Sequence, residues 1–106
     1  MKTVNRGEVW MVDTPAGDKP FVVVSNQQRN RSLDTVLCAR ITTSPKRPSL
    51  PSVVPIEDRS GAVVGRVLCD DVLQLDKGQL LRRTAAFAPR EMSRICDGLN
   101  AALACT

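Results

Sequence analysis

The sequence predicts an α+β domain that is mainly β: a strongly twisted antiparallel sheet or small barrel followed by a C-terminal amphipathic helix. Two observations predict the sheet. Short apolar runs recur along the chain, and seven prolines and six glycines mark turns between them. A third observation predicts the helix, because apolar residues recur every three or four positions after Pro89. The length of 106 residues suits a single domain spanning residues 1–106.

The first two predicted strands lie near the N-terminus. Residues 7–12 alternate as a strand that buries Trp10. Residues 14–18 form a Pro/Gly loop, and Pro20 biases the residue before it toward an extended backbone. Residues 21–25 are apolar on both faces, which is typical of a central strand.

The third predicted strand, residues 34–43, carries polar side chains toward its end. Alternation places one set of residues in the core: Leu37, Ala39 and Ile41. It places the other set on the opposite face: Val36, Cys38, Arg40 and Thr42. The cation of Arg40 and the hydroxyl of Thr42 therefore lie about 6 to 7 Å apart on one surface. Residues 26–34, ahead of this strand, are expected to form a loop or one short helical turn.

The second half of the chain contains shorter predicted elements. Residues 44–52 include three prolines and two basic residues, and we expect them to form a loop that is the best candidate lid. A short strand over 53–56 follows. The next strand, residues 62–69, contains Gly65, which marks a bulge or the close approach of another backbone. The remaining elements are a further candidate strand over 71–75, a turn at 76–78 and a strand over 80–87.

Composition restricts the chemistry of the chain. The net charge of +4 is compatible with a polyanionic partner. Because the chain has no histidine, catalysis must rest on lysine, arginine, carboxylate or hydroxyl groups. The four cysteines form no CxxC pair, so we expect no metal site and reduced thiols: Cys38, Cys69 and Cys96 in the core, and Cys105 near the chain end. No apolar run approaches the ~20 residues of a membrane span, and the polar N-terminus predicts no signal peptide, so we expect a cytosolic protein.

Five motifs occur in a characteristic order: RGEVW at 6–10, KPFVVVSN at 19–26, RITTS at 40–44, LCDD at 68–71 and LDKGQL at 75–80. Together with the C-terminal helix, they resemble the MazF/PemK (Kid) family of toxin endoribonucleases over nearly the whole chain. The resemblance implies an SH3-like barrel of the CcdB/PemK type that forms a homodimer in the bacterial cytoplasm. It also implies that single-stranded RNA is cleaved at short sequences, without a metal or other cofactor, and that a cognate antitoxin silences the protein.

The resemblance assigns catalytic roles to Lys19 and Thr42, with Asp70 as a candidate base. The family carries an arginine where this chain has Lys19, and a threonine that matches Thr42. In such toxins the 2′-hydroxyl of the RNA attacks the adjacent phosphate, which leaves a 2′,3′-cyclic phosphate and a 5′-hydroxyl end. Lys19 then supplies charge or a proton, and Thr42 holds a phosphate oxygen. Leu68 stands where the Kid branch has an arginine, so the arginine–aspartate pairing of that branch is absent.

Candidate RNA-binding residues lie beside these positions: Asn26, Asn30, Arg31, Arg40, Thr43, Ser44 and Lys46. Amide and guanidinium groups next to a groove bind base edges and stack on unpaired bases, while Lys46 suits salt-sensitive contact with phosphate. Each candidate also has an ordinary interpretation. Lys19 and Arg40 are also interpretable as surface charges, Thr42 as a strand-end residue, and Asp70 as a turn acceptor.

Two other functions stay open at this point. The same fold serves non-catalytic poisons of DNA gyrase similar to CcdB, although these end in a tail with aromatic residues and this chain ends ALACT. A nucleic-acid-binding barrel whose nuclease activity has decayed is also compatible with lysine at position 19 and leucine at position 68. Cleavage of RNA in the absence of metal separates these possibilities.

Overall fold

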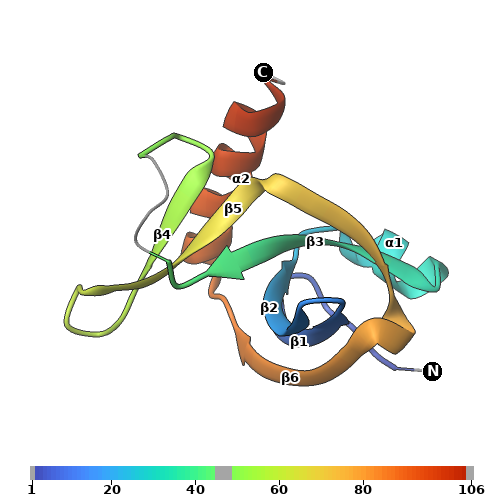
Figure 1. The fold of residues 1–106 in the computed structure, drawn as a ribbon. Coiled ribbons are helices and arrows are strands. Elements are labelled where there is room, and N and C mark those ends of the chain that lie inside the picture. The colour runs from blue at the N-terminus through green and yellow to red at the C-terminus, as the bar shows by residue number, and fades with distance from the viewer. Residues whose placement is uncertain (1, 45–48, 105–106) are drawn as a thin grey trace.

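The computed structural model describes residues 2–44 and 49–104, which form one curled antiparallel sheet and two helices (Figure 1). The six strands lie in the order β4-β5-β3-β2-β1-β6. The elements are β1 (Glu8–Thr14), β2 (Gly17–Val23), α1 (Gln27–Ser32), β3 (Thr35–Thr42), β4 (Val53–Glu57), β5 (Val63–Asp76), the 3₁₀ turn η1 (Lys77–Gln79), β6 (Leu80–Ala86) and α2 (Pro89–Leu103). The predicted fold class, a mainly β domain with a twisted antiparallel sheet and a C-terminal helix, is confirmed.

Strand β5 is the long element that bends the sheet. Its C-terminal part pairs Val72 with Ala39, whereas the next pair joins Leu68 to Arg40, so three residues of β5 have no counterpart on β3. A bulge of this kind bends a strand and increases its twist. The sequence suggested separate strands over 62–69 and 71–75; the structure instead has one continuous strand with an irregularity between them.

Both faces of the central strands are buried, in two apolar clusters. One fills the inside of the curled sheet: Val4, Trp10, Val12, Phe21, Val23, Val36, Cys38, Leu75 and Leu80. The other lies under α2: Val9, Val22, Ala39, Ile41, Val54, Val67, Cys69, Met92 and Ile95. The predicted burial of Trp10, Ala39 and Ile41 is thus confirmed.

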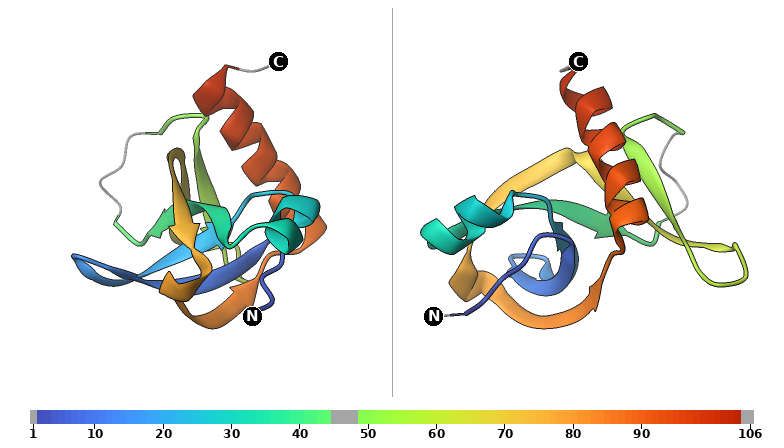
Figure 2. Two further views of the ribbon diagram at one scale, coloured as in Figure 1. Left: turned by 90° about the vertical axis from the view of Figure 1, so that its right-hand side faces the viewer. Right: turned by 180° about the vertical axis from the view of Figure 1, so that it is seen from behind.

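The predicted division of β3 into a core face and a polar face is partly wrong. Val36 and Cys38 are fully buried, whereas Leu37 is half-buried. The reason is that the sheet curls until its inner face encloses a core of its own, while α2 covers the other face (Figure 2). Only the last part of the inner face, at Arg40 and Thr42, is polar and half-buried.

Helix α2 follows the predicted apolar stripe. Pro89 occupies its first turn, and the Glu91 carboxylate accepts a hydrogen bond from the Ala88 backbone at 2.9 Å, which caps the helix start. Met92 and Ile95 are buried, and the helix packs on β4 and β5. No helix within the described residues is long and apolar enough to cross a membrane.

Candidate functional site

A polar row crosses the strands where the inner face of the sheet ends. The β3–β5 register places Thr42 opposite Arg66. On the other side of β3, Phe21 pairs with Arg40, and the same register continued by two residues places Lys19 opposite Thr42. The paired ladder itself stops at Phe21, because Pro20 has no N–H to donate. Thr42 and Arg66 are thus cross-strand partners, and Lys19 lies two residues before Phe21, the partner of Arg40. We call these four residues, Lys19, Arg40, Thr42 and Arg66, the polar row.

Gly65 allows β5 to approach this row closely. A Cβ atom built on Gly65 would lie 3.3 Å from the carbonyl oxygen of Thr42. The β4–β5 pairing is also irregular beside Gly65, between its partner Ile56 and Glu57. The sequence-based prediction of a bulge or close backbone approach at Gly65 is confirmed, and the approach occurs at Thr42 itself.

A cavity of about 270 Å³ opens beside the row, between the β1–β2 hairpin and β5. Lys19, Arg40 and Asp71 supply its charged groups, and Phe21 and Leu73 supply apolar walls. Lys19 and Arg40 are half-buried. Neither forms an ion pair: the one ion pair among residues 2–44 and 49–104 joins Arg83 to Glu8 at 2.9 Å. The cavity therefore holds two cations and one carboxylate, with no carboxylate bound directly to either cation.

Thr42 lies in the same row but does not line this cavity. Its hydroxyl oxygen accepts a hydrogen bond from the Ser44 backbone N–H at 3.1 Å. The Ser44 carbonyl in turn accepts a hydrogen bond from Arg66 Nη1 at 3.4 Å. These contacts orient the Thr42 hydroxyl through an acceptor bond, which leaves its own O–H to donate elsewhere.

Arg66 is a residue that sequence reasoning missed as a candidate. Alternation along the predicted strand indicates only that Arg66 shares a face with Leu68, and with Asp70 if the strand continues. Its position opposite Thr42 depends on the register between β3 and β5, including the bulge, and no local pattern in the sequence specifies that register.

The structure brings Asp71, rather than Asp70, to the cavity. Asp70 is exposed and does not line it, whereas Asp71 is half-buried beside Lys19 and Arg40. Both residues lie in the bulged part of β5, where simple alternation no longer identifies the face that a side chain occupies. The position of Asp71 in the cavity therefore makes it a better candidate base than Asp70, which the sequence had indicated.

The other predicted RNA-binding residues divide into two groups. Arg40, Thr43 and Ser44 lie at the C-terminal end of β3; Thr43 is exposed and Ser44 is half-buried. Asn26, Asn30 and Arg31 lie in or beside α1, at the opposite end of β3. The seven steps from Thr35 to Thr42 separate the groups by about 23 Å. Lys46 lies outside the described residues.

Asn26 and Asn30 have structural partners. Asn26 caps α1, accepting a hydrogen bond from the Arg29 backbone N–H at 2.8 Å. Asn30 is 1% exposed, and its Oδ1 is hydrogen-bonded to the Ser25 hydroxyl while its Nδ2 donates to the Ser25 carbonyl at 3.0 Å. The Asn30 side chain is therefore enclosed and occupied, and its placement does not support contact with RNA.

The buried thiols are unsuited to chemistry or metal binding. Burial raises the pKa of Cys38 to about 12. Burial, with the charges of Asp70 and Cys96, raises the pKa of Cys69 to about 11. Both thiols remain protonated at neutral pH and act as core side chains. In the described part of the chain, no three His, Cys, Asp or Glu side chains are grouped to hold a metal ion.

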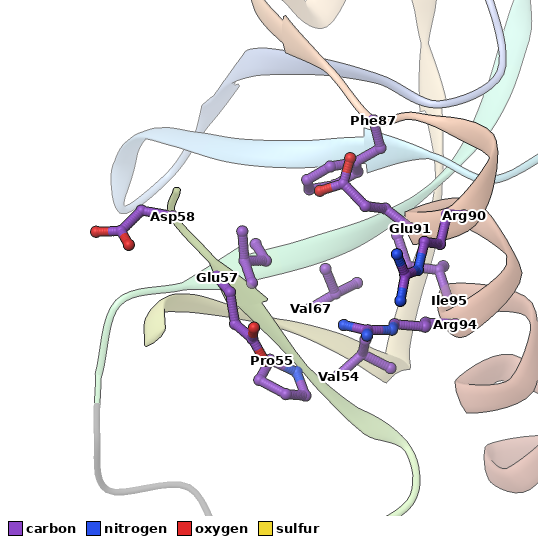
Figure 3. A pocket seen from close by; sticks show the side chains of 11 residues that line it. Val54, Pro55, Glu57, Asp58, Val67, Phe87, Arg90, Glu91, Arg94 and Ile95 are labelled. Carbon is purple, nitrogen blue, oxygen red and sulfur yellow. The ribbon is translucent and has the colours of Figure 1, made fainter. Parts of the chain in front are cut away.

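A second cavity, of about 280 Å³, lies on the other face of the sheet between β4 and α2 (Figure 3). Arg90 and Arg94 reach across it from the helix, and Val54 and Ile95 form its apolar floor. None of the residues that the sequence singled out for catalysis or RNA contact lines this cavity.

The chain is similar to proteins of one known family. The family model described as "PemK-like, MazF-like toxin of type II toxin-antitoxin system" matches residues 5–103. Endoribonuclease MazF4 of Mycobacterium tuberculosis is 34% identical over 98 residues, which cover 92% of this chain and 90% of that protein. Probable endoribonuclease MazF2 of the same organism is 29% identical over 108 residues, 96% of this chain and all of that protein.

Solved structures of similar proteins share the fold of this chain. An endoribonuclease in complex with its cognate antitoxin, from a mycobacterial species, superposes with a TM-score of 0.86 at 32% identity and covers 97% of both chains. A chain of a MazE–MazF crystal structure from Deinococcus radiodurans has a TM-score of 0.80 at 18% identity over the full length of both chains, which is a likeness of fold. The chain belongs to the family of PemK-like, MazF-like toxins of type II toxin-antitoxin systems.

Proposed function

We propose that this protein is the toxin of a type II toxin-antitoxin pair and that it cleaves single-stranded RNA as an endoribonuclease. The relatives named endoribonuclease support the activity. The observation that carries the assignment to this site is the polar row on one face of the sheet. There, Thr42 pairs with Arg66 across the strands, and Arg40 shares a cavity with Lys19. None of the three cations, Lys19, Arg40 and Arg66, forms an ion pair with a carboxylate among the described residues.

The site suits phosphodiester cleavage by the RNA itself. The 2′-oxygen forms a bond to phosphorus, the bond from phosphorus to the 5′-oxygen breaks, and the products are a 2′,3′-cyclic phosphate and a 5′-hydroxyl end. We assign to Asp71 the removal of the 2′-hydroxyl proton, and to Lys19 the donation of a proton to the leaving 5′-oxygen. Both groups line one cavity, which a reacting phosphate must share with them.

The remaining groups stabilise charge on the phosphate. From beside the cavity, the Thr42 hydroxyl donates to a non-bridging oxygen of the phosphate, while Arg40 within the cavity and Arg66 opposite Thr42 supply planar donor pairs. Lysine at position 19 is a point charge with no planar fork, so bidentate contact with phosphate falls to the two arginines. Asp70 takes no part in this assignment because it is exposed outside the cavity.

Membership of this family also indicates the protein partners of the chain. One similar structure is a complex with a cognate antitoxin, and others are titled MazE–MazF. We propose that this chain forms a homodimer in the bacterial cytoplasm and binds an antitoxin of its own. A disordered acidic segment that folds over the basic face would displace RNA from Lys19 and Arg40.

A cleavage assay with end mapping tests the proposal. Purified protein in EDTA should cut single-stranded RNA and leave 5′-hydroxyl ends, which polynucleotide kinase labels without prior phosphatase treatment. Tight RNA binding without any cleavage would indicate a decayed nuclease. Gyrase-dependent DNA breaks with intact RNA would indicate a gyrase poison, and either result would overturn the proposal.

A further inference from the structure

A third cavity lies far from the polar row, between the N-terminal segment, α1 and η1. Its volume is about 290 Å³. Its lining contains three cations and no carboxylate: Lys2, Arg31 and Lys77, with Thr3, Val4, Asn5, Gln27 and Asn30. A cavity with this lining has a positive potential that favours an anion.

The charge of Lys77 is held inside the protein. Lys77 is 7% exposed, and its ammonium donates to the carbonyl oxygen of Asn30 near the end of α1. The Lys2 ammonium donates to the carbonyl of Lys77 at 3.2 Å and also to that of Leu80. Carbonyl oxygens satisfy these donors without cancelling their net charge. In the described residues, no ion pair involves Lys2, Arg31 or Lys77.

The neutral part of the wall is fixed by its own hydrogen bonds. Gln27 Oε1 accepts from the Arg6 backbone N–H at 2.8 Å, and Gln27 Nε2 donates to Asn5 Oδ1 at 2.6 Å. The Asn5 backbone N–H donates to Glu8 at 2.8 Å. An anion that enters this cavity therefore meets a pre-formed wall, so little ordering of the protein opposes binding.

The neighbouring carboxylates do not neutralise the cavity. Asp34 and Asp76 line an adjoining cavity that shares Lys2 and Lys77. Both carboxylates are exposed and neither lines the cavity with Arg31. Solvent screens their charge, whereas the buried ammonium of Lys77 is screened much less. The Arg31 side chain is exposed at the rim, where a large anion can reach it.

We propose that this cavity, the Arg31 pocket, binds a backbone phosphate of the RNA several nucleotides away from the cleaved bond. The inference rests on the proposed RNA-cleaving function, which supplies a polyanion long enough to reach both sites. The pocket lies at the Thr35 end of β3 and the polar row lies at the Thr42 end, about 23 Å apart along the strand. Arg31 thus contributes to RNA affinity but not to the chemical step.

The test compares a long and a short RNA. Anisotropy measures binding of fully 2′-O-methylated RNAs of about 15 and about 5 nucleotides, which lack the attacking hydroxyl, over a range of salt concentrations. Arg31→Gln should weaken binding of the long RNA by ~3- to 10-fold and lower the slope of log K against log salt by about 0.7, the loss of one phosphate contact. It should leave binding of the short RNA unchanged. Arg59→Gln, an exposed arginine outside the pocket, is the control.

The outcomes separate this inference from the proposed function. Wild-type cleavage of unmodified RNA tests the function, while the binding assay tests the pocket. Unchanged affinity and salt slope in Arg31→Gln would overturn the proposal that the pocket binds RNA. Equal losses of affinity for the long and the short RNA would overturn it too. Displacement of the long RNA by millimolar inorganic phosphate, equally in wild type and Arg31→Gln, would also overturn it. A decaglutamate peptide that binds through Arg31 more tightly than the long RNA does would assign the pocket to an acidic protein segment instead.

Discussion

Lys19 and Arg40 are the two cavity cations that we expect to bind the reacting phosphate. They are half-buried beside Asp71, and neither forms an ion pair. Keeping such charges close together without direct partners has a cost in stability, which a bound polyanion offsets. The rate of cleavage therefore depends on which of these side chains touch the reacting phosphate.

Replacing Arg66 should slow RNA cleavage. Arg66 lies opposite Thr42 and hydrogen-bonds the Ser44 carbonyl, so Arg66→Ala removes a donor from the row. The expected loss in kcat/KM is on the order of 10²- to 10³-fold, comparable to the loss of one transition-state contact. Arg59→Ala, at the exposed tip between β4 and β5, should leave the rate unchanged. Equal rates for the wild type and Arg66→Ala would remove Arg66 from the site.

The two adjacent aspartates should behave differently. Asp71→Asn removes the carboxylate that lines the cavity with Lys19, so cleavage should fall by about 10²- to 10⁴-fold, the usual contribution of a general base. Asp70→Asn changes an exposed group and should retain most activity. Single-turnover rates measure both. The opposite ranking would restore Asp70 as the base and contradict the placement described above.

At the scale of elements, the contact between α2 and the sheet depends on a small residue. A Cβ atom on Gly98 would lie 2.6 Å from a methyl carbon of Val54 and 2.8 Å from the Cys69 sulfur. Gly98 is buried in the helix, directly over β4 and β5. The helix therefore packs against the sheet at a distance that no larger side chain allows.

The Gly98→Ala variant should be less stable, by roughly 1 to 3 kcal/mol of unfolding free energy. Alanine is intrinsically better than glycine in a helix by about 1 kcal/mol, so overpacking has to exceed that gain. Urea unfolding measures the balance. Ser93→Ala, an exposed position on the same helix, is the matched control and should be neutral or slightly stabilising. A Gly98→Ala protein as stable as the wild type would show that α2 moves outward at little cost.

The elements also show what the sequence can and cannot specify. The stripe over Met92 and Ile95 predicts α2, and alternation predicts β1, because these patterns are local. The bulge in β5 and the burial of Val36 are not local: they depend on how far the sheet curls and on which residues pair. The motifs are also local, so they indicated Lys19 and Thr42 from the sequence. The places of Arg66 and Asp71 depend on how β3 and β5 pair, so only the structure identified them.

At the scale of the whole molecule, Glu8 ties the N-terminal segment to β1 and β6. The carboxylate is 5% exposed and accepts hydrogen bonds from the Asn5 backbone at 2.8 Å, Arg83 at 2.9 Å and the Trp10 indole at 3.2 Å. Burial by itself acts to raise the pKa of Glu8, but these hydrogen bonds outweigh it and lower the pKa below its ordinary value of 4.5.

This network should make stability sensitive to acid. Because the folded-state pKa is depressed, ionised Glu8 stabilises the protein above pH ~4.5, and that contribution is lost as the pH falls through the folded-state pKa. Glu8→Gln should therefore be less stable than the wild type at pH 7 and should lose less stability on acidification. Thermal unfolding between pH 7 and pH 3 measures this. A variant with the same pH dependence as the wild type would show that other carboxylates account for the acid sensitivity.

Lys19 on β2 and Thr42 on the neighbouring strand β3 are the residues on which we expect RNA cleavage without a metal to depend most strongly. The most direct measurement is single-turnover cleavage of single-stranded RNA in EDTA by the wild type, Lys19→Ala, Thr42→Ala and, as the control on the α2 face, Arg94→Ala. We expect 5′-hydroxyl products, rates reduced ~100-fold or more in the first two variants, and an unchanged rate in the third. Cleavage that requires a divalent metal, or that keeps its full rate in both Lys19→Ala and Thr42→Ala, would contradict this expectation.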